Sequence, residues 1–168
     1  MKRNQVLRLT CAGLLCALAV VGSLISFPVF GSKCAPVQHM VNVIAGVLLG
    51  PGYAVGAAFV ASFIRNLIGT GTLLAFPGSM CGALLAGLLY RAGGKLPYAC
   101  VGEVVGTGIL GALLAVPIAV GLLGRTATLF AFVPSFLINT IAGSIVAALV
   151  VTALDRTSVF RDLRAAMR

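Results

Sequence analysis

The chain has 168 residues, of which 60% are hydrophobic and 9% are charged, with 21 glycines and no tryptophan. A water-soluble domain of this size needs more charge to cover its surface, so the composition predicts an integral membrane protein. Because a membrane-spanning helix takes about 20 apolar residues, the chain has room for about six spans and no soluble catalytic domain. We therefore expect one membrane domain, residues 1–168, with an all-α fold.

The net charge of +9 follows the ends of the apolar runs and does not form a nucleic-acid-binding surface. Nine of the twelve Lys and Arg residues form three clusters beside these runs: Lys2, Arg3 and Arg8; Arg91 and Lys95; and Arg156, Arg161, Arg164 and Arg168. Basic residues are enriched on the cytoplasmic side of membrane proteins. This pattern predicts a multi-pass protein of the bacterial cytoplasmic membrane with both termini in the cytoplasm, and no nucleic-acid partner.

Prolines, glycines and the basic clusters divide the chain into six expected helices. Their approximate ranges are residues 9–27, 37–49, 53–68, 74–90, 97–116 and 129–154. A basic, amphipathic tail follows at residues 155–168, and we expect it to lie on the inner surface of the membrane.

Most of the prolines fall on the outer side of this arrangement. They are Pro28, Pro36, Pro77, Pro117 and Pro134. Proline breaks the helical hydrogen-bond ladder, and broken backbone at membrane depth is tolerated where it is buried in protein or lines a cavity. We therefore expect an irregular, polar outer half with a ligand pocket open to the outside, above a regular, apolar inner half.

Polar side chains inside apolar runs are the candidate ligand-binding groups, because a polar group is costly in lipid and usually faces the bundle interior. The residues predicted to converge on the outer pocket are His39, Asn42, Arg65, Asn66, Phe76, Ser79 and Asn139. Structural alternatives remain open for several of them. His39 and Asn42 suit helix–helix contacts, Arg65 can extend to the interface, and Phe76 can face lipid.

Glu103 is the only carboxylate inside an apolar run, and Thr107 follows it one helical turn later. The position of Glu103 suits a proton site, an ion pair, a coupling contact or a ligand contact. Thr107 is a second candidate for a coupling or ligand contact. No catalytic Ser/His/Asp set, acidic pair or zinc motif is visible, and Gly69-x-Gly71 lacks the preceding strand and the Lys of a nucleotide-binding loop. The sequence therefore predicts no enzyme activity, no metal and no cofactor.

Small residues four apart form a flat face on the first expected helix. The pairs are Ala12 with Cys16 and Gly13 with Ala17. Such a face lets another helix backbone approach closely, either inside the bundle or on a partner protein.

Four stretches carry a resemblance to a known family: PVQHMVN at 36–42, LGP at 49–51, RNLIGTGTLLAFPGS at 65–79 and GEVVGTG at 102–108. They resemble the ThiW family, whose members are substrate-binding S-components of energy-coupling factor (ECF) transporters associated with the thiazole precursor of thiamin. The resemblance implies a six-helix bundle that captures hydroxyethylthiazole or a related precursor outside. It further implies docking on a transmembrane coupling subunit and two ATPase subunits, through Ala12, Gly13, Cys16 and Ala17.

Three other functions remain open from the residues alone. A stand-alone transporter using Glu103 as a proton site would depend on a proton gradient rather than on ATPase partners. A small membrane enzyme, such as a transferase, would need a catalytic motif that the sequence lacks. A structural assembly protein would not need polar residues so strongly biased to one side.

Overall fold

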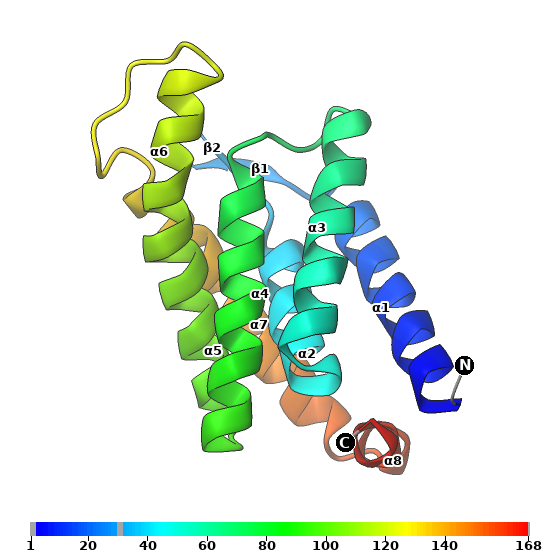
Figure 1. The fold of residues 1–168 in the computed structure, drawn as a ribbon. Helices are drawn as coiled ribbons and strands as arrows, with labels where there is room; N and C mark the ends of the chain where they lie inside the picture. Colours follow the sequence, from blue (N-terminus) through cyan, green and yellow to red (C-terminus); the bar gives the residue numbers. More distant parts are fainter. Residues whose placement is uncertain (1–2, 30–31, 168) are drawn as a thin grey trace.

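The computed structural model describes residues 3–29 and 32–167, which form a bundle of helices with a short hairpin at one end (Figure 1). The helices are α1 (Arg3–Gly22), α2 (Pro36–Leu49), α3 (Pro51–Leu67), α4 (Ala75–Gly93), α5 (Leu96–Val105), η1 (Gly106–Gly111), α6 (Ala112–Gly121), α7 (Val133–Leu154) and α8 (Ser158–Ala166). The hairpin pairs β1 (Phe27–Val29) with β2 (Ser32–Cys34) in antiparallel register. Both chain ends lie at the end of the bundle away from the hairpin.

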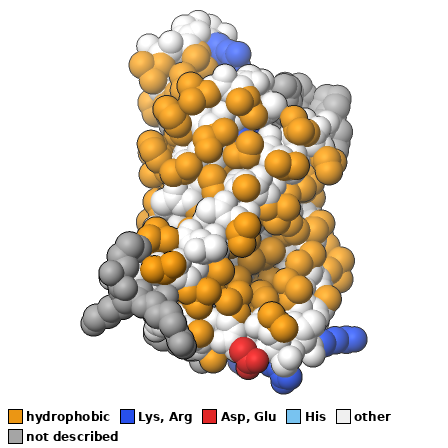
Figure 2. Space-filling view, turned by 90° about the vertical axis from the view of Figure 1, so that its right-hand side faces the viewer, with side chains coloured by type: hydrophobic (Ala, Val, Ile, Leu, Met, Phe, Trp, Pro, Cys, Tyr) orange, Lys and Arg blue, Asp and Glu red, His pale blue; other side chains and the backbone are white. Residues whose placement is uncertain are grey.

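Three helical stretches among the described residues are long and apolar enough to cross a membrane, judged by length and composition. They are Asn4–Gly22, Leu96–Gly121 and Val133–Leu154. Figure 2 shows one side of the bundle covered largely by hydrophobic side chains, with Lys and Arg mainly toward its two ends. A surface of this kind is suited to lipid rather than water, so the chain is a membrane protein.

The first helix departs most from its expected range of 9–27. It begins at Arg3 and ends at Gly22, and the Ser23 hydroxyl donates a 2.6 Å hydrogen bond to the carbonyl oxygen of Val20. Leu24 and Ile25 follow as exposed apolar residues, so hydropathy does not mark the end of the helix. The fold is helical as expected, and the two three-residue strands of the hairpin are a small addition to it that the sequence did not predict.

The expected helix at 97–116 is longer and less regular than predicted. α5, η1 and α6 form one continuous helical stretch from Leu96 to Gly121, with a π-helical segment at η1. Glycines bring this segment against α4: a Cβ at Gly106 would lie 2.5 Å from the carbonyl oxygen of Cys81, and one at Gly111 would lie 2.3 Å from the Cα of Gly78. Such contact between small residues is a common way of packing membrane helices.

α2 is the central helix of the bundle and packs against α1, α3, α4 and α7. Its residues 41–49 are all buried. The contact with α4 leaves no room for a larger side chain, because a Cβ at Gly46 would lie 2.8 Å from the backbone nitrogen of Gly87. α2 therefore connects the hairpin end of the bundle with a tightly packed opposite half.

The basic tail contains a short amphipathic helix, α8. The Thr157 hydroxyl accepts a hydrogen bond from the backbone N–H of Phe160, which caps its first turn. Phe160 and Met167 are buried in a cluster that includes Leu7 and Cys11 of α1. α8 thus packs Phe160 on the bundle, and its place at the inner membrane surface stays a prediction.

Candidate functional site

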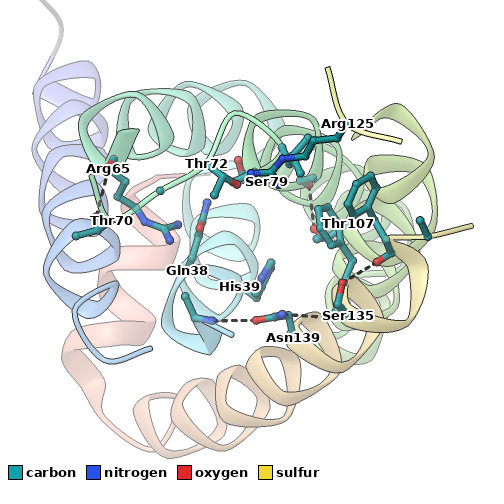
Figure 3. Close-up of a pocket in the computed structure, with 18 residues that line it drawn as sticks. Gln38, His39, Arg65, Thr70, Thr72, Ser79, Thr107, Arg125, Ser135 and Asn139 are labelled. Carbon is teal, nitrogen blue, oxygen red and sulfur yellow. Dashed lines mark hydrogen bonds between the residues drawn. The ribbon is translucent and has the colours of Figure 1, made fainter. Parts of the chain in front are cut away.

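A cavity of about 470 Å³ lies at the hairpin end of the bundle, between α2, α3, α4, η1 and α7. The polar residues that line it are Gln38, His39, Arg65, Thr70, Thr72, Ser79, Thr107, Arg125, Ser135 and Asn139 (Figure 3). Phe132 and Phe136 supply aromatic surface. Apolar and aromatic walls with a few placed polar groups are typical of small-molecule sites, and the volume is within their usual range.

Glu103 lies beneath the cavity with a side chain that is 0% exposed. Its Oε1 is 2.8 Å from His39 Nδ1 and accepts hydrogen bonds from Thr107 Oγ1 at 2.9 Å and Asn42 Nδ2 at 3.2 Å. Space for the carboxylate comes from Gly82 of α4, where a Cβ would lie 2.4 Å from Oε2. Three polar groups thus hold Oε1 of the buried carboxylate, whereas Oε2 has no hydrogen-bond partner among the residues that the structure describes.

His39 and Thr107 are the members of this cluster that line the cavity, and His39 is the one with a ring nitrogen to offer. Its ring lines the cavity wall, while Nδ1 is engaged by Glu103. A carboxylate on one ring nitrogen fixes the orientation of an imidazole and leaves the other nitrogen for a further partner. The arrangement allows His39 to donate a hydrogen bond to a ligand or accept one from it, depending on the tautomer.

A second hydrogen-bonded group connects α2, α3 and α4 beside this cluster. Gln38 Nε2 donates to Ser62 Oγ at 3.3 Å, and Ser62 Oγ lies 2.8 Å from Ser79 Oγ. Asn42 Nδ2 also donates to the carbonyl oxygen of Ser79 at 3.2 Å. Gln38 and Ser79 line the cavity, whereas Asn42 is buried below it. Asn42 therefore supports the floor and does not face a ligand directly.

Asn139 lines the opposite side of the cavity, and its amide also holds backbone. Its Oδ1 accepts a 2.9 Å hydrogen bond from the N–H of Ala35, and its Nδ2 donates to the carbonyl oxygen of Ser135 at 2.9 Å. Ala35 directly precedes α2. The residue thus ties the start of α2 to α7, which defines this side of the cavity.

Arg65 lies near the end of α3, with a side chain that lines the cavity and a residue exposure of only 5%. Its Nε and Nη1 form no hydrogen bond with any residue that the structure describes. Its backbone carbonyl oxygen, by contrast, accepts hydrogen bonds from the N–H groups of Thr70 and Gly71. Gly69, with a φ of +75°, allows the chain to turn back in this way after α3. The loop carries Thr70 and Thr72 to the cavity wall.

Besides Asn42, two residues predicted for the pocket, Asn66 and Phe76, lie outside its lining. Asn66 Nδ2 donates to the carbonyl oxygens of Ser62 and Thr72, so its amide holds the loop after α3. Phe76 packs edge-on against Phe59, with ring centroids 5.6 Å apart. The aromatic surface that the sequence assigned to Phe76 comes instead from Phe132 and Phe136, because the start of α4 turns the Phe76 ring toward α3.

The sequence reasoning also missed several lining residues. Signals for some were present: Gln38 adjoins His39, and Ser135 precedes Asn139 by one helical turn. Arg125, in the segment between α6 and α7, stands apart from the basic clusters. Its place at the cavity depends on how that segment returns over the bundle, which hydropathy does not indicate.

A second hollow, of about 610 Å³, lies between α1 and α3 on the side of the bundle. Its lining includes Ala12, Gly13 and Cys16 of α1 and Gly56 of α3. Ala17, the fourth residue of the predicted docking face, is exposed but outside this lining. A Cβ at Gly13 or Gly56 would meet no atom within 4 Å, so packing inside the bundle does not require glycine at these positions.

Comparison with known proteins places these features in a family. A search of curated proteins gave no significant match. Residues 9–157, which include every residue lining both hollows, match the family described as thiamine-precursor transporter protein (ThiW). Membership indicates transport of a small molecule as the task of the chain. The chain belongs to the ThiW family of thiamine-precursor transporters.

Proposed function

We propose that the chain is the substrate-capture component of an ECF-type importer and binds the thiazole precursor of thiamin, hydroxyethylthiazole or a related compound. The observation that carries the proposal is the cavity at the hairpin end, in a chain of a thiamine-precursor transporter family. Its volume of about 470 Å³ suits a small heterocycle. Phe132 and Phe136 offer surface for the ring, and His39 and Ser79 offer hydrogen bonds.

The proposed membrane arrangement has six spans, formed by α1, α2, α3, α4, the continuous stretch of α5, η1 and α6, and α7. The cavity then faces outward and both termini are cytoplasmic. In a cysteine-free variant, a cysteine introduced at Thr126 should react with an impermeant thiol reagent added outside, and one at Ala92 should not. Both positions are exposed, so the comparison depends on the side of the membrane. The opposite labelling pattern would overturn this topology.

The proposed partners are a transmembrane coupling subunit and two ATPase subunits. The hollow between α1 and α3 supports this part, because Gly13 and Gly56 leave open space that a partner helix can fill. Small residues of this kind allow close contact between helices in a membrane. Uptake would then require ATP hydrolysis in the partners and no catalytic group in this chain.

A stand-alone, proton-coupled transporter is the second candidate, and the buried pair of Glu103 and His39 favours it. Buried carboxylates and histidines form proton relays in such transporters. The two candidates separate in an uptake assay with labelled thiazole alcohol. Loss of uptake without the ATPase subunits supports the ECF role, whereas uptake that needs only a proton gradient supports the second candidate. Identifying the small molecule that co-purifies with the protein tests the ligand in either case.

A further inference from the structure

Arg65 is a buried cation without a partner for its charge. The residue is 5% exposed, and its Nε and Nη1 bond to nothing that the structure describes. An arginine that simply extends to the membrane interface would place its head group in water. An arginine that holds the fold would bond to backbone or side-chain acceptors. The Nε and Nη1 of Arg65 are in neither environment, and the side chain lines the cavity.

The acidic residues of the chain cannot supply the missing charge. The sequence has three of them, Glu103, Asp155 and Asp162. Glu103 lies outside the cavity lining and is engaged by His39. Asp155 and Asp162 lie after α7 and in α8, at the end of the bundle away from the hairpin. A counter-charge for Arg65 must therefore come from a bound molecule.

A second cation faces the same space. Arg125 lines the cavity from the segment between α6 and α7, and Figure 3 shows both arginine side chains extending inward from different sides of the cavity. Thr70 and Thr72 add hydroxyl groups to the lining, which contains no Asp or Glu. Two guanidinium groups with neighbouring hydroxyls form a set of donors that matches the oxygens of an anionic group.

We propose that Arg65, assisted by Arg125, forms an oxyanion subsite, and that the transported molecule is a phosphate monoester of a heterocyclic alcohol rather than the free alcohol. The choice of thiazole as heterocycle rests on the proposed function, whereas the charge of the ligand rests on the two arginines. A phosphate monoester is favoured over a carboxylate because its three terminal oxygens and its charge near −2 can engage both guanidinium groups and a hydroxyl.

The test measures binding of thiazole alcohol, its phosphate monoester and a thiazole carboxylate to the purified full-length protein in lipid nanodiscs. The variants are Arg65→Gln and, as a control with the same change in charge, Arg91→Gln. Arg91 is exposed in the last turn of α4, outside the cavity. Wild type should bind the phosphate about 10- to 150-fold more tightly than the alcohol, the range expected for charge-assisted hydrogen bonds.

Arg65→Gln should remove that preference and leave alcohol binding within about threefold of wild type, while Arg91→Gln should change neither. Arg125→Gln should reduce the preference in part, and it remains informative if Arg65→Gln fails to fold. Equal affinity of wild type for alcohol and phosphate would overturn the subsite and leave the thiazole function intact. An equal loss of affinity for alcohol and phosphate in Arg65→Gln would also overturn the subsite. A preference of wild type for the carboxylate would overturn the choice of phosphate.

If no thiazole compound binds, the proposed function fails, and inorganic pyrophosphate then tests the subsite alone. Thermal protection of wild type by pyrophosphate, lost in Arg65→Gln and kept in Arg91→Gln, would still support an anionic ligand. Absence of protection, or protection that both variants retain, would overturn it.

Discussion

The two halves of α2 differ in what they bury. Toward the hairpin, Gln38, His39 and Asn42 join hydrogen-bonded groups beside a cavity. From Val43 to Leu49 every residue is apolar or glycine and is buried against neighbouring helices. One helix thus combines a polar half beside the cavity with a close-packed half.

This difference favours capture over conduction. The residues of α2 that line the cavity, Gln38 and His39, lie in its hairpin half, and none comes from Val43–Leu49. In the other half the helix backbones approach so closely that a Cβ at Gly87 would lie 2.7 Å from Pro51. Protein interiors packed in this way do not open without rearrangement. Release of a ligand on the far side would therefore need movement of helices or of the whole bundle.

The largest effect is expected from filling the close-packed half. Gly46→Val places a side chain 2.8 Å from the backbone nitrogen of Gly87, which cannot move without shifting α4. Overpacking of a tight core typically costs about 1–3 kcal/mol, and contact with backbone puts this variant at or above the upper end. We expect little or no folded protein in size-exclusion chromatography.

The matched control is Gly56→Val, where an added Cβ meets no atom within 4 Å. It should yield folded protein in a wild-type amount. A folded Gly46→Val variant with normal thermal stability would show that the two halves of α2 do not differ in packing as described.

The next effect concerns assembly rather than folding. Gly13→Trp should fill the hollow between α1 and α3, and so abolish uptake and co-purification with the coupling subunit. Ligand binding to the isolated protein should remain at the wild-type level, because the cavity at the hairpin end does not include Gly13. Uptake assays and titration of the purified variant measure the two properties separately.

Leu14→Trp is the control, since Leu14 is 66% exposed and does not line the hollow. It should assemble normally. Normal assembly of Gly13→Trp as well would rule out this hollow as the docking surface.

A smaller effect is expected at the polar half of α2. His39→Ala removes one hydrogen bond to a ligand, and losing such a bond in a buried site costs roughly 1–3 kcal/mol, or about 5- to 150-fold in affinity. Thr10→Ala is the control, because the Thr10 hydroxyl bonds to the carbonyl oxygen of Val6 within α1, outside the cavity lining. Titration of both variants should show the loss for His39→Ala alone. Equal affinities in wild type and His39→Ala would place ligand recognition elsewhere.

Much of this arrangement is visible in the sequence, for a physical reason. Lipid penalises polar groups so strongly that His39, Arg65 and Ser79 stand out in apolar runs, and all three line the cavity. The same reasoning predicts most helices, because proline and glycine mark their ends: α2 begins at Pro36 and α3 at Pro51, within two residues of the starts expected at 37 and 53.

Hydropathy does not specify side-chain direction or irregular backbone. Phe76 and Phe136 are equally apolar, and only the packing of α4 and α7 decides that Phe136 lines the cavity. The π-helical segment packs on α4 through residues far apart in the chain, such as Gly106 and Cys81, and no periodic pattern in the sequence indicates that contact. Arg125 shows the same limit, since a loop residue reaches the cavity only through the path of the loop.

The smallest effect is expected from removing the charge of Arg65, which measures how much that charge destabilises the ligand-free protein. A buried charge without a partner is destabilising, and replacing such groups with apolar residues of similar size is often neutral or stabilising by about 1–4 kcal/mol. The cavity beside Arg65 reduces this cost. Arg65→Met should therefore raise the free energy of unfolding of the ligand-free protein by about 1 kcal/mol, or about 2–4 °C in Tm for a chain of this size. Thermal unfolding at a fixed scan rate, with Arg91→Met as the exposed control, measures it. A lower Tm for Arg65→Met would mean that the guanidinium stabilises the fold and is not an unpaired charge available to a ligand.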